Sequence, residues 1–336
     1  MADEGLERLD ALWKRGTDFL GSKYAILGGA MTWVSERNLV SAISNAGGFG
    51  VIACGGMTPE LLAAEIDATR ALTDKPFGVN LITLHPALDA LIDVCGAKGV
   101  SHVVLAGGLP SGNAIAKIKG FNAKLMCFAP TATLAKKLVR SGVDAIIIEG
   151  MEAGGHIGPV STSVLAQEIL PVITDVPVFV AGGIGRGEAI TSYLEMGASG
   201  AQLGTRFVVA EECVAHEKFK KAFIRASARD AIASVQVDAR FPVIPVRALK
   251  NEGTEKFMET QRAVVGRFHD GEVTQEEGQM QIEHFWGGAL RRAVIDGDVE
   301  TGSVMAGQSV GMVKKIEPTA AIIEELVAQA SAYLVD

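Results

Sequence analysis

Residues 178–207 read VFVAGGIGRGEAITSYLEMGASGAQLGTRF, and this stretch decides the fold. It holds two short apolar runs, at 178–180 and 200–203, with a segment of helix length between them. A glycine-containing loop follows each run at once, first Gly182-Gly183 and then Gly204-Thr205. A strand, a helix and a second strand in this order predict a unit with two parallel strands.

The same alternation extends along the chain in both directions. Apolar runs typical of buried parallel strands lie at 24–27, 49–52, 77–81, 102–105, 124–127, 144–148, 178–180 and 200–203. Helical patterns follow them near 35–46, 58–72, 87–97, 112–119, 131–141, 162–173, 186–196 and 214–226. Eight such units predict a closed α/β barrel, the (β/α)8 or TIM barrel. An open doubly wound sheet is the alternative, but the chain has neither GxGxxG nor GxxxxGK[ST].

Three regions are expected along the chain. Residues 1–229 would form the barrel. Residues 230–290 are rich in Glu, Gln, Arg and Lys, with Met and Phe at helical spacing, so we expect a helical subdomain that acts as a lid or forms a dimer. Residues 291–336 would form a loop and a closing helix near 318–333 that returns to the barrel, with Pro318 at its start.

Composition excludes several classes of function. The net charge of −8 argues against a nucleic-acid-binding surface, which needs a basic stripe. The acidic N-terminus lacks the apolar region of a signal peptide, and no apolar run approaches the ~20 residues of a membrane span, so we expect a cytoplasmic protein without membrane contact. The four cysteines are scattered and no HxH or HExxH pair occurs, so no metal site is predicted.

The two glycine loops predict a phosphate site. Active sites of barrel enzymes lie at the carboxyl ends of the strands, and phosphate often binds between the loops after strands seven and eight. Gly182 and Gly183 would let the chain approach a phosphate closely, while Gly204 and Thr205 would add an N–H group and a hydroxyl. The alternative is that these glycines only make short turns.

Other polar residues follow the predicted strands. His156 comes after two glycines beyond an apolar strand, so its ring should face the barrel mouth, where an imidazole can exchange a proton near neutral pH. A structural histidine is the alternative. Glu149 is either a second polar group of the pocket or a carboxylate held by loop N–H groups. Asn80 is a weaker candidate, because a polar residue at a strand end is often a turn cap.

The chain resembles bacterial enoyl-ACP reductase II and the related nitronate monooxygenases (2-nitropropane dioxygenases), which are FMN-dependent TIM-barrel oxidoreductases. The resemblance extends from about residue 20 to residue 330, and the order of its segments makes it specific. These segments are Met31 to Val34, Ser44 to Gly50, Leu72 to Asn80, Glu149 to Gly158, Ala181 to Ile184, Gly204 to Ala210, Val246 to Asn251 and Gly302 to Gln308.

The resemblance implies roles for individual residues. Met31, Thr32 and Asn80 would hold the flavin ring, and Glu149 and Gly155 would lie near the ring and the ribityl chain. The phosphate would be held by Gly182, Gly183, Gly204 and Thr205, and His156 matches the active-site histidine of the family. The chain departs from the reductase pattern at Ala25, Gly28 and Ala30, which puts the identity of the substrate in doubt more than flavin binding.

Several functions are consistent with these residues. The first hypothesis is NAD(P)H-dependent reduction of an enoyl thioester, with a small molecule or an acyl carrier protein bearing the acyl group. Oxidation of alkyl nitronates with O2 is the second, and the resemblance also allows an NADH:quinone reductase. A non-catalytic flavin-binding or acyl-binding module is the hypothesis from another class. We further expect a homodimer.

Overall fold

A barrel of eight parallel strands forms the centre of the computed structural model, which describes residues 2–286 and 288–335. The strands follow one another in the order β1-β9-β8-β6-β5-β4-β3-β2. Pairing between Leu27 and Phe49 joins the two end strands and closes the ring. The prediction of a (β/α)8 barrel is therefore confirmed. Its strands are β1 (Ile26–Gly28), β2 (Gly50–Ala53), β3 (Phe77–Ile82), β4 (His102–Ala106), β5 (Lys124–Phe128), β6 (Ala145–Glu149), β8 (Val178–Ala181) and β9 (Gly200–Leu203).

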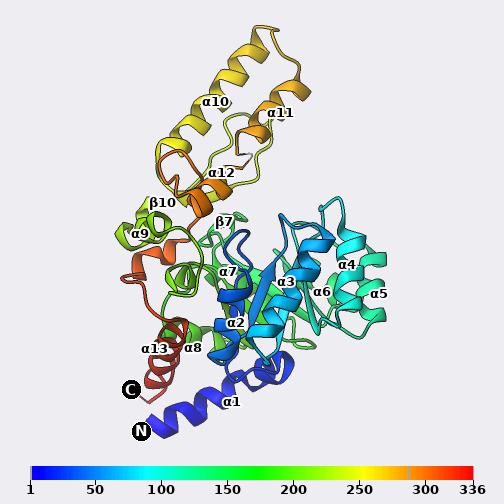
Figure 1. The fold of residues 1–336 in the computed structure, drawn as a ribbon, viewed down its shortest axis with the longest axis vertical. Coiled ribbons are helices and arrows are strands. Elements are labelled where there is room, and N and C mark those ends of the chain that lie inside the picture. Colours follow the sequence, from blue (N-terminus) through cyan, green and yellow to red (C-terminus); the bar gives the residue numbers. More distant parts are fainter. Residues whose placement is uncertain (1, 287, 336) are drawn as a thin grey trace.

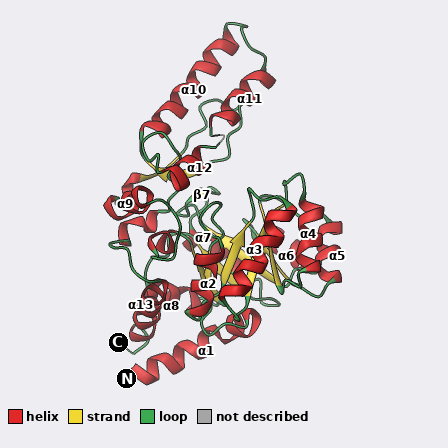
Figure 2. Ribbon diagram, viewed as in Figure 1, coloured by secondary structure: helices red, strands yellow, loops and turns green. Residues whose placement is uncertain are grey.

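Helices cover the outer face of the barrel (Figure 1, Figure 2). The last outer position is filled from the C-terminus by α13 (Thr319–Ala332), which packs against α8 and α2. The helix that follows β9 directly, α9 (Glu217–Arg225), packs instead on the short 3₁₀ helices η1 (Thr205–Val209) and η4 (Gln308–Met312). The other barrel helices are α2 (Arg37–Asn45), α3 (Pro59–Leu72), α4 (Leu88–Ala97), α5 (Gly112–Gly120), α6 (Ala132–Arg140), α7 (Thr162–Ile169) and α8 (Gly187–Glu195).

Successive side chains of each strand point to opposite faces of the sheet, so the apolar ones form two cores, one inside the barrel and one between the barrel and the helices. In β6, Ile147 packs inside the barrel, whereas Ile146 and Ile148 pack against the helices. The helix α1 (Ala2–Leu20), which the sequence analysis did not predict, crosses the end of the barrel opposite the mouth. Its last residues seal that end, where the Phe19 carbonyl lies 2.9 Å from the His102 ring nitrogen Nε2. Burial lowers the pKa of His102 to about 4, so this histidine is neutral and structural.

A small second sheet lies between the barrel and the helices of residues 252–285 (Figure 1). It consists of β7 (Gly155–His156), β11 (Val246–Leu249) and β10 (Ala231–Ala233), all antiparallel, with β11 in the centre. We expected helices in residues 230–290, and the two strands β10 and β11 also lie there. They are short, and β7, which extends their sheet, lies about 90 residues earlier in the chain, so no local pattern marked them. No strand of residues 230–286 joins the barrel sheet.

Helices α10 (Glu252–His269) and α11 (Gln275–Phe285) form a lobe that projects from the mouth side of the barrel (Figure 1). The lobe has its own core of Phe241, Phe257, Val264 and Ile282. The chain returns through α12 (Ala289–Arg291) and the single π-helical turn η3 (Arg292–Asp296); the 3₁₀ turn η2 (Ala228–Asp230) precedes β10. Division into independent units at residues 229 and 290 stays a prediction. No helix among the described residues is long and apolar enough to cross a membrane.

Candidate active site

The loop after β1 forms one side of the barrel mouth. Ser35 holds it in a tight turn, because its hydroxyl donates to the Gly29 carbonyl at 2.9 Å and accepts from the Met31 N–H at 3.0 Å. The Met31 sulfur lies beside Gly204 of the loop after β9, and the Thr32 hydroxyl lies beside Gly55 of the loop after β2. The two predicted residues Met31 and Thr32 therefore lie where three strand-end loops meet.

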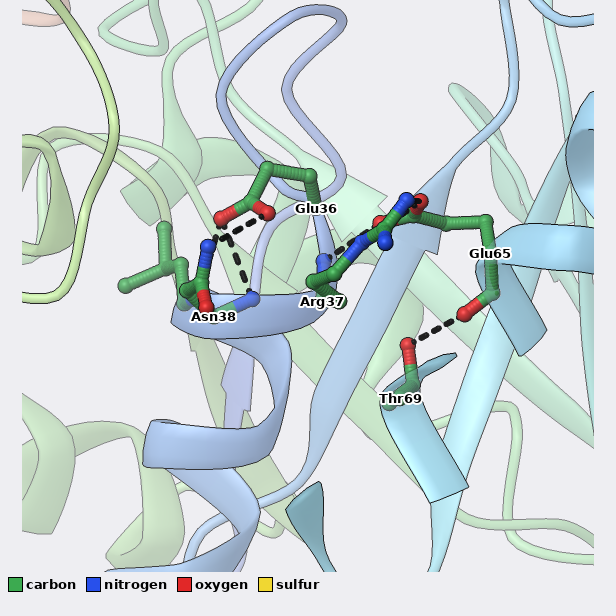
Figure 3. A network of polar contacts seen from close by, with 6 residues as sticks. Glu36, Arg37, Asn38, Glu65 and Thr69 are labelled. Carbon is green, nitrogen blue, oxygen red and sulfur yellow. Dashed lines mark hydrogen bonds and ion pairs between the residues drawn. The ribbon is translucent and has the colours of Figure 1, made fainter. Parts of the chain in front are cut away.

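A polar network fixes the far end of this loop (Figure 3). The Glu36 carboxylate accepts hydrogen bonds from the Asn38 and Leu39 N–H groups and so caps α2. The next residue, Arg37, binds the buried Glu65 carboxylate on α3 through its backbone N–H at 2.6 Å and its side-chain Nε at 3.0 Å. The mouth loop is thus anchored to two barrel helices, α2 and α3.

The loops after β8 and β9 adjoin each other and offer free backbone donors. Gly182 and Gly183 have φ of +95° and +73°, values that glycine adopts without strain. Among the described residues, the N–H groups of Gly183, Gly204 and Thr205 have no acceptor. The Thr205 hydroxyl accepts from the Gly307 N–H at 3.0 Å and keeps its own proton to donate. Free N–H groups on adjacent strand-end loops suit a phosphate.

Asn80 and Glu149 are the polar side chains near the ends of β3 and β6. Asn80 lies inside β3, paired with Ala53, so the turn-cap explanation is wrong. Its buried side-chain amide makes no hydrogen bond to any described residue. The same is true of the Glu149 carboxylate at the last position of β6, so loop N–H groups do not hold it. Burial raises the pKa of Glu149 to about 7.

The raised pKa of Glu149 makes stability depend on pH. The folded protein holds the proton more tightly than the unfolded chain, so the favourable contribution is complete below about pH 4.5 and is lost as pH rises through about 7. Glu149→Gln cannot ionise. We expect the unfolding free energy of this variant to equal that of the wild-type apoprotein near pH 4.5 and to be greater by about 1–3 kcal/mol at pH 8. Urea unfolding at both pH values checks this. A difference in unfolding free energy that does not change with pH would contradict it.

His156 is held outside the barrel wall, in β7 of the second sheet. Its backbone pairs with Val246, and the next residue, Ile157, donates its N–H to the Pro245 carbonyl at 3.0 Å. The ring is accessible to solvent and makes no hydrogen bond to any described residue. The surrounding chain still removes enough water to lower the pKa of His156, so the imidazole is neutral at pH 7. It belongs to the loop that follows β6 and hence lies on the mouth side with Glu149.

Sequence reasoning did not identify three residues that build this site. The Glu152 carboxylate accepts from the N–H and hydroxyl of Thr162 at the start of α7, and its side chain lies against Gly183. Gly307 holds Thr205, and the buried Arg247 donates to the Met151 carbonyl. Arg247 and Gly307 lie within segments that carry the family resemblance, but their partners are about 100 residues away in the chain, so no spacing signal pointed to them.

Known proteins resemble this chain along almost its whole length. The family model for nitronate monooxygenase matches residues 14–91 and 87–329. FabK from Thermotoga maritima is 36% identical, with a TM-score of 0.86 over 96% of this chain and 97% of that one. A nitroalkane oxidase from Streptomyces ansochromogenes is 26% identical, with a TM-score of 0.77 over 95% and 98%. The (3aS,4S,5R,7aS)-5-hydroxy-7a-methyl-1-oxo-octahydro-1H-indene-4-carboxyl-CoA dehydrogenase of Mycobacterium tuberculosis is 30% identical over 95% of this chain and 96% of its own.

Proposed function

The chain belongs to the nitronate monooxygenase family and is an oxidoreductase, and we propose that it binds FMN and reduces the C=C bond of an enoyl thioester with NAD(P)H. The observation that supports this proposal is that free backbone N–H groups after β8 and β9, and a histidine without a hydrogen-bond partner in the loop after β6, follow strands of the barrel at their carboxyl ends. In the overall reaction a hydride from NAD(P)H and one proton add across the double bond, and NAD(P)⁺ is released.

The residues present fit FMN. The free N–H groups of Gly183, Gly204 and Thr205 provide donors for the terminal phosphate, and a Cβ at Gly182 would lie 3.0 Å from the Gly150 carbonyl. This loop therefore leaves no room for a side chain at Gly182. Met31, Thr32, Asn80, Glu149 and Gly155 would line the ring and the ribityl chain. When bound, FMN would carry the hydride between the two substrates.

His156 would act on the acyl substrate. A neutral imidazole donates one N–H, which can hydrogen-bond to the thioester carbonyl and withdraw electron density from the double bond. The same group can hold the proton that the α-carbon receives. Glu149, with a pKa near 7, is the second group at this mouth that can keep a proton at neutral pH.

Two comparisons favour a thioester over a nitronate. The identity to FabK exceeds that to the nitroalkane oxidase by ten percentage points at similar coverage. The Mycobacterium tuberculosis relative is named for a substrate that is itself a CoA thioester. Oxidation of alkyl nitronates remains the second candidate because the family model and the nitroalkane oxidase both match nearly the full chain. An acyl carrier protein as the carrier of the acyl group, a homodimer and a cytoplasmic location belong to the same proposal.

Anaerobic stopped-flow absorbance tests the choice of substrate. We expect NADH or NADPH to bleach the flavin band of the purified protein and an enoyl-CoA to restore it within one turnover. A nitronate that bleaches the flavin unaided, with slow reduction by both nicotinamides, would replace the enoyl reductase with a nitronate monooxygenase. The wild-type protein denatured at the end should release FMN, and release of FAD or of no flavin would contradict the cofactor assignment.

A further inference from the structure

The loop that carries His156 cannot hold its own shape. It connects β6 to α7 and contains four glycines, at 150, 154, 155 and 158, which leave the unfolded segment many conformations to lose. Gly155 has φ of +80°. Among the described residues, the backbone hydrogen bonds within the loop close only its base, from the Met151 N–H to the Val160 carbonyl and from the Ala153 N–H to the Gly150 carbonyl. The position of His156 must therefore come from outside the loop.

The second sheet supplies that support. Its central strand β11 pairs with β7 on one side and β10 on the other, so the His156 backbone is an edge of a sheet built by residues 231–249. The opposite side of the loop is held by the Gln308 N–H, which donates to the Glu152 carbonyl at 2.9 Å. Only residues 250 and 251 separate β11 from α10, so the lobe and this sheet are directly joined.

Arg247 on β11 ties these pieces together. The residue as a whole is only 4% exposed. Its Nε donates to the Met151 carbonyl at 2.9 Å, and its Nη1 donates to the Ala231 carbonyl at 2.5 Å. The planar guanidinium thus joins the start of the His156 loop to the start of β10. No carboxylate of the described residues lies within ion-pair distance of it. Burial lowers the pKa of Arg247, and the charge of the nearby Glu152 carboxylate opposes that shift in part.

A buried charge that contacts no carboxylate directly is costly, and an apolar side chain of similar size would fill the same space at a lower free-energy cost. Stability alone does not account for an arginine here. We propose that Arg247 is the positioning residue for His156: it fixes the loop after β6 to the second sheet so that the imidazole stands in place at the mouth. This rests on the proposed function for the role of His156, but not for the anchoring of the loop.

The experiment compares the holoprotein with Arg247→Met, Arg247→Lys and the control Arg262→Met, which removes an exposed arginine from α10. Hydrogen exchange is measured for residues 151–158, together with flavin content and both half-reactions. We expect Arg247→Met to keep its FMN, to exchange roughly tenfold faster in 151–158, and to leave 178–184 unchanged. Its acceptor half-reaction should slow by roughly 10- to 100-fold at saturating enoyl-CoA, because a displaced catalytic group lowers kcat rather than binding.

The exchange rate in 151–158 and the acceptor rate of Arg247→Lys should lie between those of the wild type and Arg247→Met, because an ammonium keeps the charge but lacks the planar fork of a guanidinium. It also preserves the test if the methionine variant does not fold. Unchanged exchange in 151–158, or faster exchange with an unchanged acceptor reaction, would overturn the positioning role. His156→Ala in the same series separates the two proposals: if that variant turns over the acceptor normally, the proposed function fails, while the exchange data still decide whether Arg247 anchors the loop.

Discussion

Replacing His156 with alanine should slow the acceptor half-reaction by roughly 10²- to 10⁴-fold, the usual contribution of a positioned proton-transfer group. The ring makes no hydrogen bond to any described residue, so its removal breaks no structural contact of that kind. Flavin content should stay near the wild-type level, because the proposed phosphate donors lie on the loops after β8 and β9. Reduction of the flavin by NAD(P)H should change much less, since hydride transfer from the nicotinamide needs no proton from this residue.

The measurement is single-turnover absorbance of the flavin in each direction. His284→Ala is the matched control, because His284 is an exposed histidine on α11 in the lobe, and both of its half-reactions should equal those of the wild type. His156→Gln should recover part of the lost rate if the ring acts only by donating an N–H to the thioester carbonyl. If His156→Ala carried out both half-reactions at the wild-type rate, the histidine would not be catalytic.

The barrel could be predicted because its signals are local. Each strand is a short apolar run followed by a helix-length segment, and the observed strands agree with the expected ones to within two residues at either end. The end of the chain shows where local signals stop. The helix that completes the ring, α13, was expected near 318–333, but its place between α8 and α2 depends on closure of the barrel.

The second sheet could not be predicted, and the reason is physical. β7 has two residues and β10 has three, so neither has a recognisable period of its own. They become strands because β11 lies between them after the chain has folded. His156 was found by its strand-end glycines, whereas Arg247 acts through main-chain carbonyls, which carry no signal in a side-chain pattern.

Replacing Gly183 with valine should weaken FMN binding by roughly 10²- to 10⁴-fold, because it removes charge-assisted hydrogen bonds to phosphate worth about 1.5–3 kcal/mol each. Gly183 has φ of +73°, and a Cβ added there would lie 3.0 Å from the Glu152 side chain. Valine is branched at Cβ, so it fits this backbone poorly and must displace either the loop or Glu152. Displacing the loop turns the Gly183 N–H away from its neighbours at Gly204 and Thr205.

The control must separate backbone strain from loss of the cradle. Gly197→Val provides it, because Gly197 also has a positive φ, +106°, but a Cβ there would meet no atom within 4 Å. Both variants should lose about 1–3 kcal/mol of unfolding free energy from strain. Only Gly183→Val should lose FMN, measured by fluorescence titration of each apoprotein with FMN. Equal FMN affinity in the two variants would mean that the loop after β8 does not hold the phosphate, since both variants place a side chain at a positive φ but only Gly183 lies in that loop.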